Sequence, residues 1–368
     1  MVRPVPSPRD PLRPLLVRDE LRPFFLDDRG LNLLDQRLLP DEEHWTVLMN
    51  PSDVVEHTAE AIEGLAVRGA PAIGGAAALA LACFARRPPK VAPDVFVDTL
   101  RRADTRLRRT RPTAVNLFVA LDAVAHAVGR AFESDGTVHD IAAAVIDAAE
   151  DYLLQDEAAC VAMGAAGASL LQDGDLVVTI CHTGALATCG QGTALGVVKS
   201  ARKQGKNVGV LALETRPLLQ GARLTTWECM REGIPVTLIT DGMAAFALQK
   251  KRVTRALVGA DRIAQNGDTA NKIGTFSLAV ACAHHGIPFH VVAPRTTIDV
   301  ACADGDAIRI EERFADEVRR VRGNPIAPLQ VPVWNPAFDV TAASLIASFI
   351  TNAGIAQPPF FTDDGAHP

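Results

Sequence analysis

The spacing of apolar and polar residues divides the chain into a helical first part and a second part in which strands and helices alternate. Before residue 164, Ala-rich stretches repeat apolar residues at i, i+3 and i+4, which is typical of amphipathic helices. We predict helices over Asp53–Gly64, Gly74–Phe84, Val95–Arg109, Ala114–Glu133 and His139–Met163. From Leu21 to Leu48, apolar and polar residues alternate around turn signals, which predicts a small antiparallel β unit.

Short β-rich apolar runs alternate with helical segments after Gly174. The runs are LVVTIC, VGVLAL, PVTLIT, RALVGA and PFHVVA, which begin at residues 176, 208, 235, 255 and 288. Strands that alternate with helices predict βαβ units and a parallel sheet. Each run ends in a polar or glycine-rich elbow, and right-handed crossovers bring all such elbows to one edge. The sequence thus predicts an α/β protein with a leader at 1–20, a mostly helical domain at 21–150 and a parallel-sheet domain at 151–368.

Composition narrows the class of protein. A chain of 368 residues with 48% hydrophobic residues can bury two domain cores. The net charge of −6 argues against a nucleic-acid partner, and no apolar run approaches the roughly 20 residues that a membrane helix needs. The proline-rich N-terminus does not resemble a signal peptide. Seven cysteines form no CxxC pair, which favours reduced thiols in a cytoplasmic protein without a structural metal.

The segment Leu257–Thr275, LVGADRIAQNGDTANKIGT, carries four ionisable side chains and three glycines at the end of an apolar run. Asp261 follows the run directly, and we expect the chain to turn through residues 266–268 before a small-residue helix begins near Ile273. In open α/β sheets, ligands bind where strands end and helices begin. Asp261 is therefore a candidate for chemistry.

A second elbow lies within Val177–Val198, where a strand, a Gly/Thr-rich turn and a helix follow one another. Free backbone N–H groups in such a turn suit an anion, although close helix–strand packing explains the glycines equally well. The thiol of Cys181 could be held there as a thiolate, or could be a small buried hydrophobe. His182 should project to the opposite face. We interpret the remaining cysteines as buried apolar residues: Cys83, Cys160, Cys189, Cys229, Cys282 and Cys302.

Polar residues at other turns have two interpretations each. Arg68, in VRGAPAIGG, and Arg111, in RTRPTAVNL, stand before helix starts, where they could bind an oxyanion or could be exposed arginines at plain turns. Gln220, in ETRPLLQGARLT, could bond a hydroxylated ligand. His284 and His285 diverge by about 100° on a helix, so we interpret them as a solvated helix end and not as a metal pair.

Taken together, these motifs resemble the methylthioribose-1-phosphate isomerases, in the superfamily that includes regulatory subunits of the translation-initiation guanine-nucleotide exchange factor. The matching blocks are LNLLDQRLLP, VRGAPAIG, RPTAVNL, CHTGALAT with GTALG, ETRPLLQGARLT, DGMAA, GADRIAQNGDTANKIGT and NPAFDVT. They span nearly the whole chain after the leader. One departure is visible, because the family commonly has Asn where this chain has His182.

The resemblance implies a Rossmann-like catalytic domain, a homodimer, and a step in methionine salvage that needs no cofactor. The family's catalytic cysteine falls on Cys181 and its acid on Asp261. Its substrate-binding positions fall on Arg68, Gly69, Ala70, Arg111, Gln220, Asn271 and Lys272. The substrate would be a small sugar phosphate, with ribose 1,5-bisphosphate and 5-deoxyribose 1-phosphate as alternatives to 5-methylthioribose 1-phosphate.

The implied chemistry fits these residue types. The phosphate on the anomeric oxygen prevents simple ring opening, so an acid must protonate the ring oxygen, and Asp261 needs a raised pKa to do so. Cys181 would then move a proton from C2 to C1. A hydride shift is an alternative route. Two alternative functions are a non-catalytic exchange-factor subunit and a nucleotide-dependent dehydrogenase. Against the dehydrogenase, this chain lacks a GxGxxG motif at the end of a strand.

Overall fold

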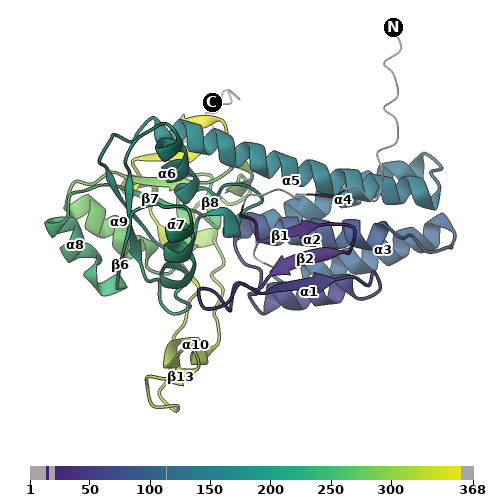
Figure 1. Cartoon of the computed structure of the whole chain (residues 1–368), viewed down its shortest axis with the longest axis horizontal. Helices are drawn as coiled ribbons and strands as arrows, with labels where there is room; N and C mark the ends of the chain where they lie inside the picture. The colour runs from purple at the N-terminus through teal and green to yellow at the C-terminus, as the bar shows by residue number, and fades with distance from the viewer. Residues whose placement is uncertain (1–13, 16–20, 113, 358–368) are drawn as a thin grey trace, which may run out of the picture. The chain divides into compact units, whose positions relative to one another are not determined.

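The computed structural model describes residues 14–15, 21–112 and 114–357, and the chain divides into two compact units, Met1–Asp156 and Glu157–Pro368 (Figure 1). Most of the predicted leader lies outside the described residues. Leu15 pairs with Leu26 in an isolated antiparallel bridge. The division falls within one long helix, α5, Val138–Ala168.

The first unit contains the small antiparallel sheet that the sequence predicts. Its strands are β1 (Phe24–Leu26), β2 (Leu31–Leu34) and β3 (Trp45–Leu48), in the order β1-β2-β3. Phe24 lies opposite Leu33, and both are buried. The predicted β unit is therefore confirmed.

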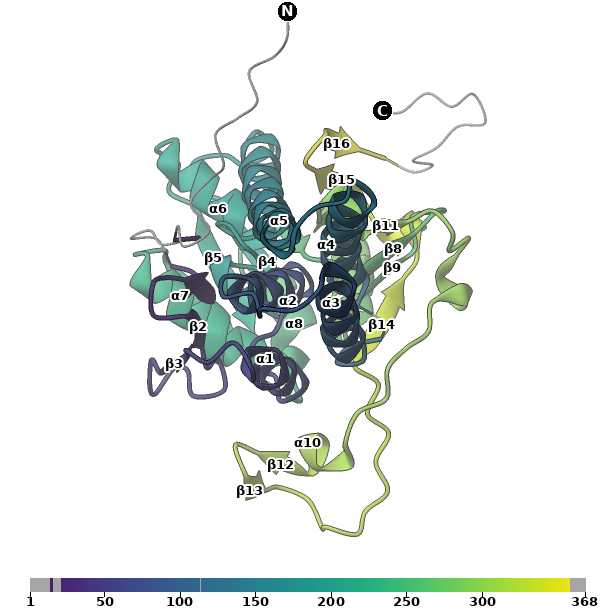
Figure 2. The same cartoon turned by 90° about the vertical axis from the view of Figure 1, so that its right-hand side faces the viewer.

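The predicted helices of this unit are also present. They are α1 (Val54–Glu63), α2 (Ala70–Ala85), α3 (Pro93–Arg108), α4 (Val115–Glu133) and the first part of α5. Helix α2 is buried on nearly all sides, because its alanines and glycines let α1, α3 and α4 approach closely (Figure 2). A helix that is apolar all round belongs in a core.

Helix α4 is long and apolar enough to cross a membrane, judged by length and composition alone. This differs from the prediction that no such run exists. Its apolar residues, among them Leu117, Leu121 and Val124, are buried, and α4 packs on α2 and α3. Its outer face carries Asp122, which forms an ion pair with Arg108. The helix thus has the pattern of a core helix in a globular unit.

The second unit is built on a seven-stranded sheet of order β16-β15-β10-β7-β4-β5-β6. All neighbouring strands are parallel except β15 and β16. The strands are β4 (Leu176–Thr179), β5 (Gly209–Leu213), β6 (Val236–Ile239), β7 (Val253–Val258), β10 (Phe289–Val292), β15 (Ser348–Thr351) and β16 (Gly354–Ala356). Every strand predicted for the parallel sheet is present, which confirms the α/β class.

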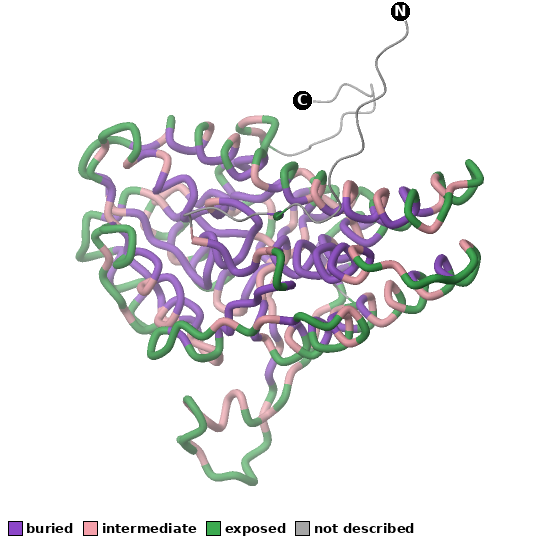
Figure 3. Tube along the Cα trace, turned by 45° about the vertical axis from the view of Figure 1, so that its right-hand side comes forward, coloured by how far each residue is buried: buried purple, intermediate pink, exposed green. Residues whose placement is uncertain are grey.

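Helices cover both faces of this sheet. They are α6 (Ala194–Lys203), α7 (Thr226–Arg231), α8 (Ala244–Lys250) and α9 (Thr275–His284). Successive strand residues alternate between two cores, since Val178 packs in the core with α8 and α9, whereas Val177 packs in the core with α5 and α6. Figure 3 shows the buried residues in purple.

A second, four-stranded sheet of order β11-β8-β9-β14 interrupts the expected path from β7 to α9. Its strands are β8 (Arg262–Ala264), β9 (Thr269–Lys272), β11 (Ile298–Asp299) and β14 (Phe338–Thr341). The sequence analysis expected only a turn here. The short alternating runs gain their strand character from β14, which pairs antiparallel with β9 and lies far away in sequence.

An arm of the second unit carries α10 (Ala315–Arg319), β12 (Arg320–Val321) and β13 (Asn324–Pro325). Figure 2 shows it projecting from the rest of that unit, and Figure 3 shows that its residues are exposed or half-buried. The sequence analysis did not anticipate it.

Candidate active site

Cys181 follows β4 in an unusual backbone conformation. Its φ is +64°, in the left-handed region that a residue with a side chain seldom adopts, and the residue is buried. The Cys181 N–H donates to the Thr215 hydroxyl at 2.8 Å, and the Thr225 hydroxyl donates to the Cys181 carbonyl at 2.7 Å. Strained residues that surrounding contacts hold in place are concentrated at functional sites. This supports Cys181 as a site residue.

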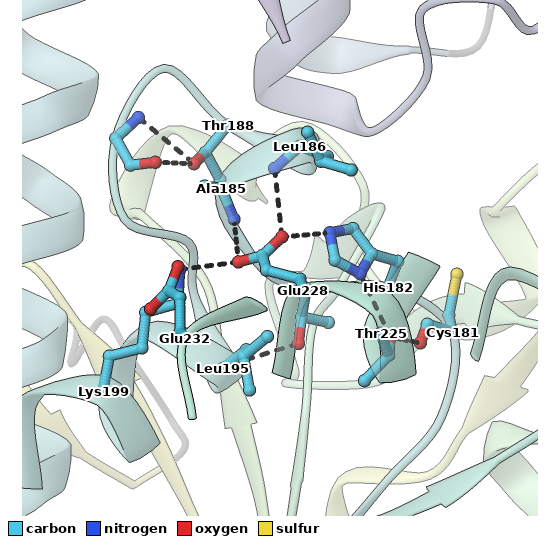
Figure 4. Close-up of polar contacts among 12 residues, drawn as sticks. Cys181, His182, Ala185, Leu186, Thr188, Leu195, Lys199, Thr225, Glu228 and Glu232 are labelled. Carbon is cyan, nitrogen blue, oxygen red and sulfur yellow. Dashed lines mark hydrogen bonds and ion pairs between the residues drawn. The ribbon is translucent and has the colours of Figure 1, made fainter. Parts of the chain in front are cut away.

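The imidazole of His182 points to Glu228, whereas the thiol of Cys181 points away from that carboxylate (Figure 4). His182 Nε2 lies 3.0 Å from Glu228 Oε2, and its Nδ1 lies 3.1 Å from the Thr225 hydroxyl. The two side chains extend in different directions, although β4 ends at Thr179 and neither residue lies in a strand.

The Gly/Thr-rich turn after Cys181 binds an anion, but that anion is a side chain of the same chain. The Ala185 and Leu186 N–H groups donate to Glu228 at 2.8 and 3.5 Å. A Cβ on Gly184 would lie 2.2 Å from Glu228 Oε1, so only glycine fits beside this carboxylate. Of the two interpretations of this turn, the anion site is present, but its N–H groups are already bonded to a carboxylate of the protein. The sequence-local pattern indicated an anion site, and Glu228, on a helix distant in sequence, fills it.

Glu228 is fully buried and ionised. Burial alone raises the pKa of its carboxyl, but Lys199 and His182 reverse this and hold the pKa well below its usual range. Lys199 Nζ lies 2.6 Å from Glu228 and 2.5 Å from Glu232. Burial lowers the pKa of the Lys199 ammonium, yet the two carboxylates raise it overall. A buried charge network therefore lies directly behind the Cys181 turn.

Asp261 lies just beyond β7, which neighbours β4 in the sheet. Its N–H donates to the Ala270 carbonyl at 2.9 Å, and its side chain is half-buried. A Cβ on Gly259 would lie 3.1 Å from a methyl carbon of Thr183, so the chain leaving β7 packs closely on the Cys181 turn. The predicted convergence of these two elbows at one edge is present.

The other ionisable residues of Leu257–Thr275 have structural contacts. Arg262 forms an ion pair with Asp299 at 3.3 Å. Asp268 accepts backbone N–H bonds from Gly305 and Ala343. Burial raises the pKa of its carboxyl, but these donors and Asn266 lower it overall. Asp268 thus connects the β8–β9 hairpin by hydrogen bonds to two segments that are distant in sequence.

Asn271 and Lys272 end β9. Asn271 Nδ2 donates to the Thr275 hydroxyl at 3.1 Å. Lys272 Nζ donates to the Ala337 carbonyl at 3.0 Å and lies 4.6 Å from the centroid of the Phe338 ring. Both residues are buried and ordered by contacts within the second unit.

Gln220 lies in the loop after β5, the other neighbour of β4. The residue is buried, and among the residues that the structure describes, its Oε1 has no hydrogen-bond partner. A buried amide oxygen without a donor is costly, which favours a ligand that supplies one. Arg216, in the same loop, donates to the Val318 carbonyl in α10 of the arm, at 2.9 Å.

The remaining predicted residues belong to the first unit. Arg68 and Gly69 precede α2, which begins at Ala70, and Arg111 precedes α4. The Tyr152 hydroxyl lies 3.5 Å from the Pro71 carbonyl and 3.4 Å from that of Asn116, so the first turns of α2 and α4 lie close together. Two helix N-termini and two arginines thus occupy one end of this unit, as an oxyanion site requires.

The cysteines predicted to be apolar core residues are all buried free thiols. Burial raises the pKa of the Cys282 thiol to about 12. His284 ends α9 and is exposed, with His285 next to it. Across residues 14–15, 21–112 and 114–357 there is no cluster of three His, Cys, Asp or Glu side chains that could hold a metal ion. The expectation of catalysis without a metal or cofactor remains a prediction.

Five residues that hold the Cys181 turn were not among those predicted from the sequence: Thr215, Thr225, Glu228, Lys199 and Asp241. Asp241 accepts N–H bonds from Thr215 and Arg216 at 2.8 and 2.6 Å. One signal was available, because Lys199 lies on the apolar face of its helix, four residues after Leu195, and a lysine there needs a buried acid.

Comparison with known proteins agrees with this geometry. A model of the Initiation factor 2 subunit family matches residues 66–358, and the chain belongs to that family. A crystal structure of the translation initiation factor eIF-2B, subunit delta, from A. fulgidus has a TM-score of 0.82 and 44% identity, covering 93% of this chain and 97% of that one.

Within this family, the chain is similar to proteins named methylthioribose-1-phosphate isomerase. The one from Pelotomaculum thermopropionicum is 49% identical over 90% of each chain, and the one from Anaeromyxobacter sp. (strain K) is 49% identical over 94% of this chain and 96% of its own. The crystal structure of 5-methylthioribose 1-phosphate isomerase from Pyrococcus horikoshii OT3 has a TM-score of 0.86 and 40% identity, covering 96% of both chains. The resemblance stated from the motifs is confirmed.

Proposed function

We propose that this protein is an aldose–ketose isomerase that converts 5-methylthioribose 1-phosphate to 5-methylthioribulose 1-phosphate, a step of methionine salvage. The observation that carries the proposal is the meeting of the Cys181 and Asp261 elbows at the carboxyl ends of the adjacent strands β4 and β7. The relatives named above support the substrate.

In the proposed mechanism, Asp261 is the acid and Cys181 the proton carrier. Asp261 protonates the ring oxygen, which opens the ring of a sugar whose anomeric oxygen carries phosphate. Cys181 removes the proton from C2 and returns it to C1 of the enediol-type intermediate, while the C2 hydroxyl gives up its proton and so restores the protonated form of Asp261, which gives the ketose. The half-buried Asp261 and buried Cys181 suit proton transfers that bulk water would disturb.

The substrate-binding roles are part of the proposal. Arg68, Gly69, Ala70 and Arg111 would hold the phosphate, for which the N-termini of α2 and α4 supply favourable partial charge. Gln220, Asn271 and Lys272 would hold hydroxyl groups. The unpartnered Oε1 of Gln220 supports this role, because a sugar hydroxyl can donate to it.

Offering purified protein 5-methylthioribose 1-phosphate, 5-deoxyribose 1-phosphate and ribose 1,5-bisphosphate tests the function. We expect ketose formation to be fastest with the first. Reaction in deuterated water tests the route, since proton transfer through an exchanging thiol allows deuterium at C1 of the product, whereas a hydride shift leaves C1 unlabelled.

A second candidate function is that of a non-catalytic exchange-factor subunit. The A. fulgidus structure, at 44% identity, favours it. Such a subunit has no need for a strained Cys181 beside Asp261, so the geometry favours the isomerase. Absence of ketose formation with all three sugar phosphates would support the second candidate.

We further propose that the protein is a cytoplasmic homodimer. Free thiols at all seven cysteines suit a reducing compartment. Light scattering after size exclusion tests the dimer, because a mass near the 39.1 kDa of one chain would reject it.

A further inference from the structure

His182 lies in a chain of ion pairs and hydrogen bonds that ends on the backbone of Cys181 (Figure 4). Its Nε2 faces Glu228 at 3.0 Å, and the side chains of both residues are inaccessible to solvent. Its Nδ1 faces the Thr225 hydroxyl at 3.1 Å, and that hydroxyl donates to the Cys181 carbonyl at 2.7 Å. The order is therefore Lys199, Glu228, His182, Thr225, Cys181.

The donors and acceptors along this series of contacts determine the protonation state of the His182 imidazole. A carbonyl oxygen can only accept, so the single proton of the Thr225 hydroxyl points to Cys181. Toward Nδ1 the same hydroxyl can then only accept, so Nδ1 must carry a proton. Glu228 is ionised and its Oε2 lies 3.0 Å from Nε2, where a bare ring nitrogen would face a carboxylate oxygen, so Nε2 carries a proton as well. Both ring nitrogens are protonated, which makes His182 an imidazolium.

The charges around the ring allow this buried cation. Two cations, His182 and Lys199, share Glu228, and Glu232 adds a second carboxylate on Lys199. Burial, with Glu228, raises the pKa of the neighbouring Cys229 thiol to about 12, so that thiol stays neutral. Cations and carboxylates therefore balance, as buried ionic groups require.

We propose that His182 is a positioning residue, held as an imidazolium by Glu228, that orients the Thr225 hydroxyl onto the Cys181 carbonyl and so fixes the turn presenting the thiol. The inference rests on the proposed catalytic role of Cys181. The carbonyl bond from Thr225 and the amide bond to Thr215 hold both ends of the residue, whose φ of +64° would otherwise relax.

Loss of the His182 proton would change the turn. A neutral ring that keeps its proton on Nε2 for Glu228 presents a bare Nδ1, and the Thr225 hydroxyl then donates to Nδ1 in place of the Cys181 carbonyl. The carbonyl loses its donor, and the position of the thiol is no longer fixed. His182 thus links a charge network to Cys181, the proposed proton carrier, without touching substrate.

The protonation state is measured by NMR of imidazole nitrogens in the full-length protein at a pH of about 8, where an ordinary histidine is neutral. His290 is a matched internal control. It is also buried, with Nδ1 2.8 Å from the Ser348 hydroxyl, but burial and Arg255 lower the pKa of its imidazole to about 4. Signals are assigned from His182→Gln and His290→Gln. We expect two protonated nitrogens for His182 and one for His290, and one unprotonated His182 nitrogen would overturn the inference.

Kinetics of three variants test the positioning role. His182→Leu and Thr225→Val should lower kcat by roughly 100-fold at nearly unchanged KM, because a misplaced thiol affects the chemical step. His182→Asn should recover part of this loss, since its amide can donate to Thr225 from the place of Nδ1. The positioning role would be contradicted if His182→Asn and His182→Leu were equally active. It would also be contradicted if the losses in kcat were explained by the fraction of each variant that is folded. An inactive wild-type protein would instead reject the proposed function, while the imidazole spectrum still decides the protonation state.

Discussion

The amide of Cys181 donates a 2.8 Å hydrogen bond to the hydroxyl of Thr215, and both residues have left-handed backbone, with φ of +64° and +68°. The bond joins the elbow after β4 to the elbow after β5, the neighbouring strand. Thr215 is itself held, because its N–H donates to Asp241 at 2.8 Å. Each strained elbow therefore depends on the other.

Replacing Thr215 by valine should weaken both the fold and the proposed reaction. The change leaves the buried Cys181 N–H without an acceptor, which costs about 1–3 kcal/mol of unfolding free energy. Urea unfolding measures the loss. Thr254→Val is the matched control, since the Thr254 hydroxyl is exposed and its bond to Leu176 is long, at 3.4 Å. Similar stability of the two variants would show that the Thr215 hydroxyl does not hold the elbow.

Gly184→Ala should disrupt the turn after Cys181. The added Cβ would lie 2.2 Å from the Glu228 carboxylate, which is fully buried and bonded on several sides, so we expect a loss of about 1–3 kcal/mol. Gly129→Ala in α4 is the control. A Cβ there meets nothing within 4 Å, and better helix propensity should stabilise the protein by about 0.5–1 kcal/mol. The unfolding temperature should fall for Gly184→Ala and rise for Gly129→Ala. A shift of both temperatures in the same direction would be evidence against the steric role of Glu228.

His290 should make the protein less stable in acid. Burial, with a smaller effect of Arg255, lowers the pKa of its imidazole from 6.5 to about 4 in the folded state. Between these two pH values, His290 binds a proton in the unfolded chain but not in the folded one. The contribution of His290 to the free energy of unfolding is therefore fully present above pH 6.5, and about 3 kcal/mol of it is lost as the pH falls toward 4.

Urea unfolding of the wild type and of His290→Gln, at pH values of about 7.5 and 4.5, isolates this effect. Other groups titrate in the same range, among them Asp339, whose carboxyl has its pKa raised to about 6 mainly by burial. The difference between the two proteins removes those shared contributions. We expect the difference in unfolding free energy between wild type and His290→Gln to be smaller at the acidic pH. An equal difference at both pH values would mean that His290 titrates as an ordinary histidine.

Much of the fold follows from local pattern. The runs that became β4, β5, β6, β7 and β10 are apolar, short and bounded by elbows, so a parallel sheet could be predicted from them, although not the order of its strands. The β8–β9 hairpin could not, because Thr269–Lys272 becomes a strand only by pairing with Phe338–Thr341. Pairing between segments so distant in sequence leaves no periodic signal in either one.

The candidate site likewise has residues that the sequence could indicate and residues that it could not. Cys181 and Asp261 were predictable, since each ends an apolar run, and the edge at which they meet follows from parallel topology. Glu228 was not, because nothing in TTWECM indicates that its carboxylate will occupy the turn at Gly184. The sequence left these glycines open between an anion site and close helix–strand packing, and the structure places an internal carboxylate beside them.

If Cys181 and Asp261 together carry out the isomerisation, removing either group should nearly abolish it, and the turnover of 5-methylthioribose 1-phosphate by Cys181→Ala and Asp261→Asn measures this. Asp268→Asn is the control on the same hairpin, where Asp268 only clips loops together, so it should lower stability and leave turnover per folded molecule close to wild type. We expect each of the first two variants to lose about 10²–10⁴-fold in kcat while circular dichroism shows an intact fold. Turnover near the wild-type value in either variant would contradict the claim.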